Sequence, residues 1–376
     1  MTEAPPVWAG AERLLAEVAQ RLEHPVAPPW REAVRRVNRE AFLPGRVWLR
    51  DGAGGYRACD REREPRRWAD AAASDEPLVT RLTDDGIPLS SASAPSTVLR
   101  MLEQARLRDG ARVLEIGTGT GYHAALLAAR LGDGRVTTIE LDGSLADRAR
   151  AALERAGFPG VRVESGDGAL GCPPAAPYDA VLATCAIREV PQAWLEQTRP
   201  GAVIVAPWAS SWLAYGTLTL ARQPTGAARG RFAPGGSYMA MRGAHGAAVS
   251  ELEDVYRPGH VPERSTTALS PWAVAGTALD AAFAVGLAVP DVWHSWDTSG
   301  QHAPTRLWLV DDAATSWAAV DHDGHQAGRF AVAQWGPRRL WDEVAAAYRR
   351  WEADGSPDIA RHTLTVAPDR AAAVLR

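Results

Sequence analysis

Residues 113–121, Val-Leu-Glu-Ile-Gly-Thr-Gly-Thr-Gly, form an apolar run that ends in three alternating glycines. This order is typical of a buried strand that turns sharply into a helix beside a bound cofactor, because glycine lets the backbone approach a ligand where a Cβ would collide. Two kinds of cofactor loop share the pattern. A dinucleotide fingerprint needs Gly or Ala at the sixth position of G-x-G-x-x-G, where this chain has Tyr122. The loop therefore favours an S-adenosylmethionine site over a nicotinamide site.

Acidic residues follow the predicted strands of the same region. We predict four strands, within residues 113–116, 136–140, 161–168 and 180–184, and a helix at 122–131. In a parallel sheet the carboxyl ends of the strands meet at one edge, where open α/β folds bind their ligands. We expect Glu115 beside the cationic amino-acid part of the cofactor, Glu140 on the ribose hydroxyls and Asp167 near the adenine. Each acid alone could belong to an ordinary strand-end turn, but three in register favour a cofactor site.

Composition limits the classes of protein. The chain has 376 residues, of which 46% are hydrophobic and 23% charged, so we expect a globular protein of two domains. A net charge of −4 gives no reason to expect binding to nucleic acid or to an anionic membrane. Cys59, Cys172 and Cys185 are odd in number and lack metal-ligand spacing, which indicates reduced thiols, with Cys185 a packed residue rather than a nucleophile. With no transmembrane run and no signal-peptide pattern, we expect a cytoplasmic protein.

A serine-rich segment, residues 88–95, precedes the helix predicted at 97–107. Ser90, Ser91 and Ser93 offer hydroxyls and free backbone N–H groups at a helix start. Such groups either cap the helix or hold a carboxylate. Both interpretations remain open on the sequence.

Together these motifs resemble those of the protein-L-isoaspartate O-methyltransferases. The similar segments are residues 41–44, 74–78, 93–95, 113–122, 166–168, 176–179 and 190–201, so the resemblance covers roughly residues 30–220. It implies an α/β fold, the Rossmann-like fold of class I S-adenosylmethionine-dependent methyltransferases, and a carboxyl O-methyltransferase that releases S-adenosylhomocysteine. It also implies that Ser93 positions the substrate carboxylate, with Ser91 and Ser90 as alternatives. The implied cofactor residues are Glu115, Gly117, Thr118, Gly119, Gly121, Tyr122, Glu140, Leu141, Asp167, Gly168 and Thr184.

The chain departs from this family pattern in three places. Asn38 and Ala202 replace a proline and a glycine of the pattern, and the chain continues well beyond the point where repair enzymes end. This longer form resembles actinobacterial homologues from pathways of modified ribosomal peptides. The resemblance implies methylation of an Asp side chain in a precursor peptide that has been macrocyclised, followed by closure to aspartimide or opening to isoaspartate. The alternative is repair of L-isoaspartyl residues in proteins.

We expect three parts: a helical and loop segment at 1–90, the methyltransferase domain at 91–244, and an α+β domain at 245–376. In the last part we predict strands at 307–310, 316–320 and 330–333 and a helix whose apolar stripe runs from Leu340 to Trp351. Eight of the 15 tryptophans lie there, so we expect this domain to recognise the peptide. Four of its histidines, His294, His302, His322 and His325, lack ligand spacing, and we expect no metal.

Overall fold

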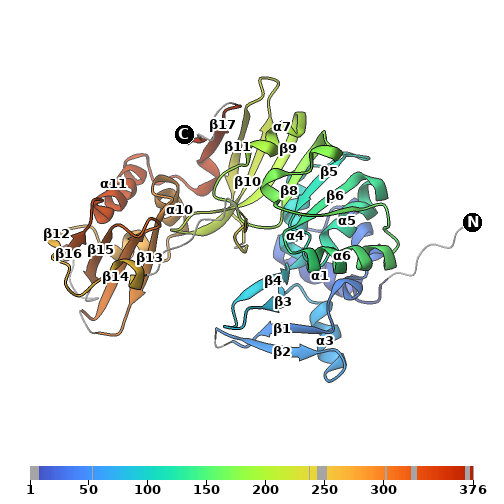
Figure 1. Ribbon diagram of the computed structural model, residues 1–376, viewed down its shortest axis with the longest axis horizontal. Coiled ribbons are helices and arrows are strands. Elements are labelled where there is room, and N and C mark those ends of the chain that lie inside the picture. The colour runs from blue at the N-terminus through green and yellow to red at the C-terminus, as the bar shows by residue number, and fades with distance from the viewer. Residues whose placement is uncertain are drawn as a thin grey trace, which may run out of the picture.

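The computed structural model describes residues 8–52, 54–236, 238–243, 252–300, 303–322, 328–368 and 373–375. Three β-sheets organise this chain, with most helices packed on the largest sheet and on the sheet of the C-terminal domain (Figure 1). The largest has the strand order β18-β17-β11-β10-β9-β8-β5-β6-β7. Its strands are β5 (Val113–Ile116), β6 (Val136–Glu140), β7 (Arg162–Ser165), β8 (Tyr178–Ala183), β9 (Thr198–Ala209), β10 (Ala214–Arg222), β11 (Ala228–Ala233), β17 (Thr363–Val366) and β18 (Ala373–Leu375).

The four strands predicted from the sequence are β5, β6, β7 and β8, and they pair in parallel as expected. Strand β9 adds a further parallel pair, and the remaining pairs of the sheet are antiparallel. Helix α5 (Tyr122–Leu131) begins after Gly121, whose φ of 87° is the left-handed conformation that glycine adopts without strain. The predicted α/β class and the Rossmann-like arrangement are confirmed.

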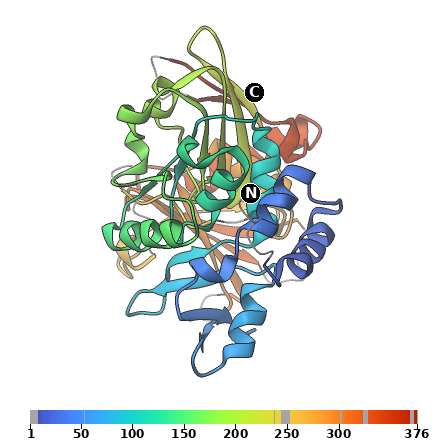
Figure 2. The same ribbon diagram turned by 90° about the vertical axis from the view of Figure 1, so that its right-hand side faces the viewer.

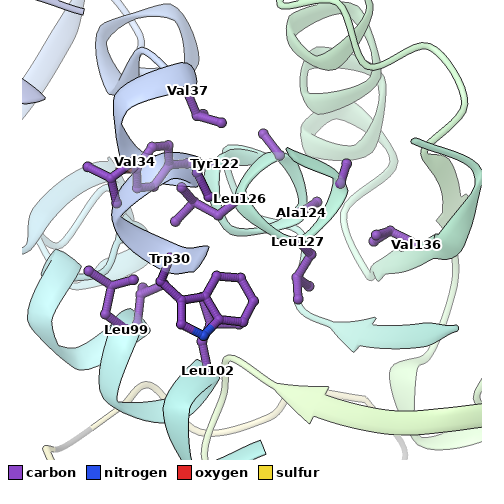
Figure 3. Packing of buried hydrophobic residues seen from close by; sticks show 14 of the residues in the cluster. Trp30, Val34, Val37, Leu99, Leu102, Tyr122, Ala124, Leu126, Leu127 and Val136 are labelled. Atoms are coloured by element: carbon purple, nitrogen blue, oxygen red, sulfur yellow. The ribbon is translucent and has the colours of Figure 1, made fainter. Parts of the chain in front are cut away.

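The N-terminal helices share one hydrophobic core with this sheet. Helices α1 (Ala11–Leu22), α2 (Pro28–Arg36) and α4 (Pro95–Ala105) pack with α5 around Trp30, Val34, Leu99 and Leu126 (Figure 3). Figure 2 shows α1 and α2 in blue beside the sheet helices. Helix α6 (Gly143–Arg155) lies against β6 and β7. The segment expected at 1–90 is therefore not one unit, because its helices α1 and α2 belong to the core of the methyltransferase domain.

The rest of that segment folds as a separate antiparallel sheet. Its order is β2-β1-β3-β4, from β1 (Arg46–Arg50), β2 (Tyr56–Asp60), β3 (Leu78–Leu82) and β4 (Pro88–Ala92), with α3 (Pro65–Ala72) packed against it. The Arg-rich stretch at 50–70 contains β2 and most of α3. Cys59 and Trp68 are buried in its small core. The sequence of this region contains few apolar residues that would predict such a core. Ser90 and Ser91 lie on strand β4 rather than in a loop.

A five-stranded antiparallel sheet forms the C-terminal domain, with the order β12-β16-β15-β14-β13. Its elements are β12 (Glu263–Thr267), β13 (Val292–Asp297), β14 (Thr305–Asp311), β15 (Trp317–His322), β16 (Phe330–Trp335), α8 (Leu252–Val255), α9 (Pro271–Ala275), α10 (Leu279–Ala288) and α11 (Leu340–Ala353). Helices α9, α10 and α11 pack on one face around Leu307 and Val344, and α8 covers Trp308 and Trp317 on the other. The predicted strands and the predicted helix are present.

The chain then returns to the largest sheet. Strand β17 pairs with β11, and β18 pairs with β17. The expected domain at 245–376 is therefore not one unit: its five-stranded sheet is inserted between two neighbouring strands, β11 and β17. In the described part of the chain, no helix has the length and apolar content needed to cross a bilayer.

Candidate active site

A cavity of about 520 Å³ lies where the parallel strands end, between the nine-stranded and the four-stranded sheets. Both sheets and the segment 238–243 contribute to its wall. The predicted residues that line it are Ser90, Ser91, Ser93, Gly117, Thr118, Gly119, Tyr122, Glu140, Leu141, Gly168 and Thr184. The sheet edge predicted from the sequence is therefore the edge at which the cavity opens.

The glycine loop forms the floor of the cavity. Gly117 has a φ of 91°, and a Cβ at this position would lie 2.6 Å from the Thr184 hydroxyl oxygen. That hydroxyl donates a hydrogen bond to the Gly117 carbonyl at 2.6 Å. Any larger residue at 117 would both strain the backbone and displace Thr184, so the loop brings bare backbone to the cavity.

Glu140 is the acidic residue that faces the cavity. Its side chain is buried, and its two oxygens accept the N–H groups of Gly119 at 2.9 Å and Asp142 at 3.1 Å. A carboxylate has about four lone-pair sites, so each oxygen keeps room for one more donor. Two vicinal ribose hydroxyls match this capacity. Leu141 and Gly168 add apolar wall beside it, which suits an adenine, so the residues present fit S-adenosylmethionine.

Glu115 has a different role from the one expected. It is fully buried and is absent from the cavity wall. Its carboxylate accepts hydrogen bonds from His123 Nδ1 and from the Thr138 hydroxyl, both at 2.5 Å. Because Thr138 uses its proton on Glu115, the Thr118 hydroxyl donates to Thr138, at 2.7 Å. Glu115 lies within β5 rather than at its end. Through Thr138 and Thr118 it holds the glycine loop in place, and it does not line the cavity.

Gly121 and Asp167 also lie outside the lining. A Cβ on Gly121 would lie 3.4 Å from the Cβ of Ala149, so this glycine serves the close packing of α5 on α6. Asp167 Oδ1 accepts the N–H of Ala169 at 2.9 Å and caps the short helix at 168–170. Asp167 therefore forms a local cap next to Gly168, and its contact with the adenine stays a prediction.

The serines border the glycine loop from the opposite side. The Ser91 carbonyl lies 3.7 Å from the position that a Cβ on Gly119 would occupy, so β4 runs beside the loop. The Ser90 hydroxyl is buried and accepts a hydrogen bond from the Thr80 hydroxyl at 3.0 Å. Ser91 and Ser93 are partly exposed to the cavity. These two hydroxyls are the ones placed to meet a substrate.

The capping interpretation of the serines does not fit the structure. The N-cap of α4 is Ala94, which has no side-chain cap. The N–H of Ser96 donates instead to Asp75 Oδ1, at 2.7 Å, and the Asp75 N–H donates to Glu17. Asp75, in the turn between α3 and β3, therefore caps α4, and the hydroxyls of Ser91 and Ser93 are not needed as caps.

Arg39 holds the serine segment in place, a role that the sequence did not reveal. Its guanidinium is fully buried and donates to four backbone carbonyls: those of Ala72, Ser74, Glu76 and Ser93, at 2.8 to 3.3 Å. Burial lowers the pKa of Arg39 to about 10, so it stays protonated at neutral pH. Arg39 fixes the backbone at Ser93 without itself lining the cavity.

Cys185 lines the cavity next to Thr184. Burial, and then the nearby Glu140 carboxylate, raise the pKa of its thiol to about 12. A thiol that stays protonated at neutral pH is a weak nucleophile. This agrees with the interpretation of Cys185 as a packed residue.

The histidines of the C-terminal domain lie in aromatic surroundings. The His294 ring is 4.3 Å from that of Trp212, and His322 stacks on Phe330. His302 and His325 lie outside the described residues. Within the described ranges no three His, Cys, Asp or Glu side chains gather as metal ligands would.

Other wall residues come from segments without a recognisable motif. Arg50 and Tyr56 face each other across the β1–β2 hairpin, and Arg242 lies in the segment 238–243. Ala186, just after β8, binds this segment through hydrogen bonds to Met239 and Met241, both of 2.8 Å. Only the fold places these residues beside the glycine loop, so no sequence signal could have identified them.

Comparison with known proteins identifies the family. The sequence profile of the family described as protein-L-isoaspartate(D-aspartate) O-methyltransferase matches residues 57–215. A protein-L-isoaspartate O-methyltransferase of Ignicoccus hospitalis is 47% identical over 128 residues, which are 33% of this chain and 61% of that protein. One of Pyrococcus horikoshii is 38% identical over 166 residues, 43% of this chain and 75% of that protein.

A solved structure of a protein-L-isoaspartate O-methyltransferase shares the fold over nearly the whole length. It covers 97% of this chain, with 99% of its own chain matched, a TM-score of 0.57 and 20% identity. The inserted C-terminal sheet is thus part of an architecture already seen with that family's methyltransferase fold. With its glycine loop, its Glu140 pocket and these relatives, the chain belongs to the protein-L-isoaspartate O-methyltransferase family of S-adenosylmethionine-dependent enzymes.

Proposed function

We propose that this chain transfers a methyl group from S-adenosylmethionine to a carboxylate of a peptide, and that its substrate is an L-isoaspartyl residue. The observation that carries the proposal is the approach of β4 to the glycine loop, which places Ser91 and Ser93 in the same cavity as Glu140. Relatives with 38% and 47% identity carry the name of that activity.

Methyl transfer to a carboxylate requires correct positioning of the substrate rather than acid–base groups. When bound, the cofactor supplies an electrophilic methyl group, which a carboxylate oxygen accepts while the electron pair of the broken bond stays on sulfur. A carboxylate is ionised at neutral pH, so no base has to remove a proton. The chain's part is to hold the substrate oxygen in line and to exclude water, which can lower a barrier by several kcal/mol. The hydroxyls of Ser91 and Ser93 and the backbone fixed by Arg39 serve this alignment.

A second candidate is the Asp side chain of a modified ribosomal peptide, with closure of the ester to aspartimide. The observation that favours it is the origin of the cavity wall. Arg50, Tyr56 and the segment 238–243 lie outside the matched residues 57–215, so this part of the wall is not described by the family profile. The inserted domain does not separate the two candidates, because its fold also occurs in an isoaspartate methyltransferase structure.

One mass-spectrometric experiment tests both candidates. The enzyme and S-adenosylmethionine are incubated with three versions of one peptide: linear with isoaspartate, linear with Asp, and macrocyclic with Asp. A methyl ester on the isoaspartyl peptide alone supports the first candidate. An ester on the macrocycle that then loses methanol supports the second. A methyl group on nitrogen, or no transfer to any of the three, overturns the proposed carboxyl methylation.

A further inference from the structure

Two arginines from distant parts of the chain line the cavity. Arg50 is the last residue of β1, and Arg242 lies near Cys185, in the segment that Ala186 binds. Both side chains are exposed. Among the residues that the structure describes, neither arginine forms an ion pair with an acid, whereas Arg57 pairs with Glu64 and Arg81 with Asp142.

These arginines add positive charge to the cavity wall of a chain that is negative overall. Among the described residues, the wall contains one acidic residue, Glu140, whose oxygens are already bound to Gly119 and Asp142. The whole chain has a net charge of −4. Two unpaired guanidinium groups beside an opening raise the local concentration of anions and steer them inward.

The reacting carboxylate is a poor partner for these charges. Its negative charge disappears as the ester forms, so a guanidinium at that oxygen would stabilise the reactant more than the transition state and would slow the transfer. Neutral hydroxyls, such as those of Ser91 and Ser93, do not carry this penalty. Arg50 and Arg242 therefore suit an anion that keeps its charge throughout the reaction.

An isoaspartyl or aspartyl residue within a peptide has only one free carboxylate, which is the one that reacts. We propose that Arg50 and Arg242 form a subsite for a second carboxylate of the substrate, the side chain of an Asp or Glu close to the methylated residue. The proposal rests on the proposed carboxyl methyltransferase activity and holds for either candidate substrate. Bidentate pairing of guanidinium with carboxylate gives such a site its selectivity for acids.

The test compares peptides that differ only next to the methylated residue. The first peptide has Glu next to the methylated residue and the second has Gln, and both have an amidated carboxyl terminus. The third peptide has Gln at that position and a free carboxyl terminus. We expect the Glu peptide to have a KM about tenfold below that of the Gln peptide at similar kcat, as one charged hydrogen bond provides. If the third peptide has a KM well below that of the Glu peptide, the terminus is the preferred source of the second carboxylate, and the side-chain assignment is overturned.

Variants of the arginines locate the effect. Arg50→Gln and Arg242→Gln should each raise the KM of the Glu peptide severalfold and leave that of the Gln peptide nearly unchanged. Arg66→Gln, an exposed arginine of α3 outside the wall, is the matched control. Affinity for S-adenosylhomocysteine and the thermal midpoint should stay the same in all three variants. Equal KM values for the Glu and Gln peptides, or equal losses on both, would overturn the subsite; failure to methylate any peptide would instead refute the proposed function.

Discussion

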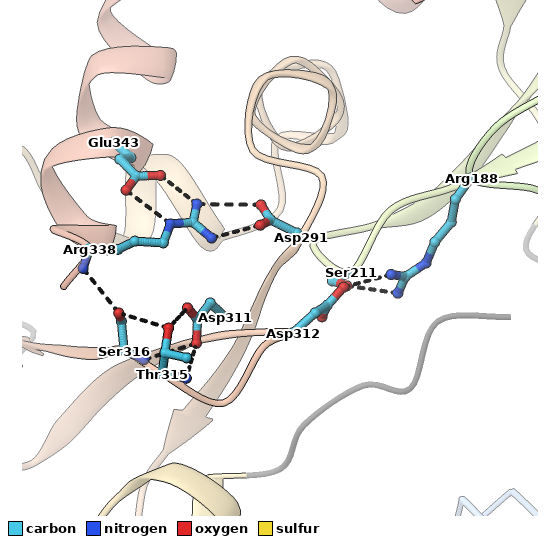
Figure 4. Close-up of polar contacts among 9 residues, drawn as sticks. All are labelled: Arg188, Ser211, Asp291, Asp311, Asp312, Thr315, Ser316, Arg338 and Glu343. Atoms are coloured by element: carbon cyan, nitrogen blue, oxygen red, sulfur yellow. Dashed lines mark hydrogen bonds and ion pairs between the residues drawn. The ribbon is translucent and has the colours of Figure 1, made fainter. Parts of the chain in front are cut away.

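Arg188 Nη1 lies 2.6 Å from Asp312 Oδ2 and joins the turn after β8 to the β14–β15 turn of the inserted domain (Figure 4). Arg188 Nη2 donates to the Ser211 hydroxyl at 2.7 Å, and that hydroxyl donates to Asp312. Ala186, two residues before Arg188, holds the segment 238–243 at the cavity. The inserted domain is therefore attached to the turn that also carries part of the cavity wall.

Arg188→Gln should weaken this junction. The ion pair is mostly buried, so we expect a coupling free energy of about 1–2 kcal/mol between Arg188 and Asp312 in a double-mutant cycle with Asp312→Asn. Urea unfolding of the four proteins measures it. Arg199→Gln, which removes an exposed ion pair with Asp179, is the control and should cost little. A coupling within experimental error would mean that this ion pair does not help to hold the two domains together.

Glu140→Gln should weaken cofactor binding. The amide keeps one acceptor oxygen for the backbone but loses the charge and the second acceptor, so we expect a loss of roughly 1–3 kcal/mol in affinity for S-adenosylhomocysteine, measured by calorimetry. Glu164→Gln on the neighbouring strand β7, outside the cavity, is the matched control. If Glu140→Gln binds S-adenosylhomocysteine with unchanged affinity, the assignment of Glu140 as a cofactor ligand is wrong.

The three serines should separate into two groups. Ser93→Ala and Ser91→Ala should lower kcat/KM for the peptide while S-adenosylhomocysteine affinity is retained, since both residues line the cavity and are partly exposed. Ser90→Ala should instead lower the free energy of unfolding by about 1 kcal/mol, because it removes the acceptor of the buried Thr80 hydroxyl. The serine assignment fails if Ser90→Ala has the largest effect on turnover and the other two variants behave like the wild type.

His294 should make the stability depend on pH. Burial lowers the pKa of His294 from 6.5 to about 4. Between these values the unfolded chain binds a proton that the folded chain does not, so stability falls as the pH drops from 6.5 towards 4. His294→Phe keeps the ring beside Trp212 and should reduce the loss between pH 7 and pH 4.5 by roughly 2 kcal/mol. His362, whose pKa burial also lowers, is present in both proteins and cancels from the comparison. Parallel stability curves for the two proteins would show that His294 is protonated normally in the fold.

The parallel strands and α5 were predictable because each has a local pattern, short apolar runs for the strands and apolar residues at helical spacing for α5, and because glycine follows β5 and α5. Glu140 was predictable for the same reason, since it closes its strand. Glu115 was misassigned because a single sequence does not say which way a strand residue faces, and here it faces helix α5 and His123. Arg50 and Arg242 were not predictable, because they line one cavity only through the packing of a hairpin and a connecting segment that are far apart in the chain.

The position of β17 has a consequence for how the protein is made. The inserted sheet leaves the large sheet from β11 and returns to its neighbour β17, so the unpaired edge of β11 waits until residues 363–366 have been synthesised. An exposed edge strand is a site for pairing with other chains. During translation the whole inserted sheet is therefore synthesised before the strand that covers this edge.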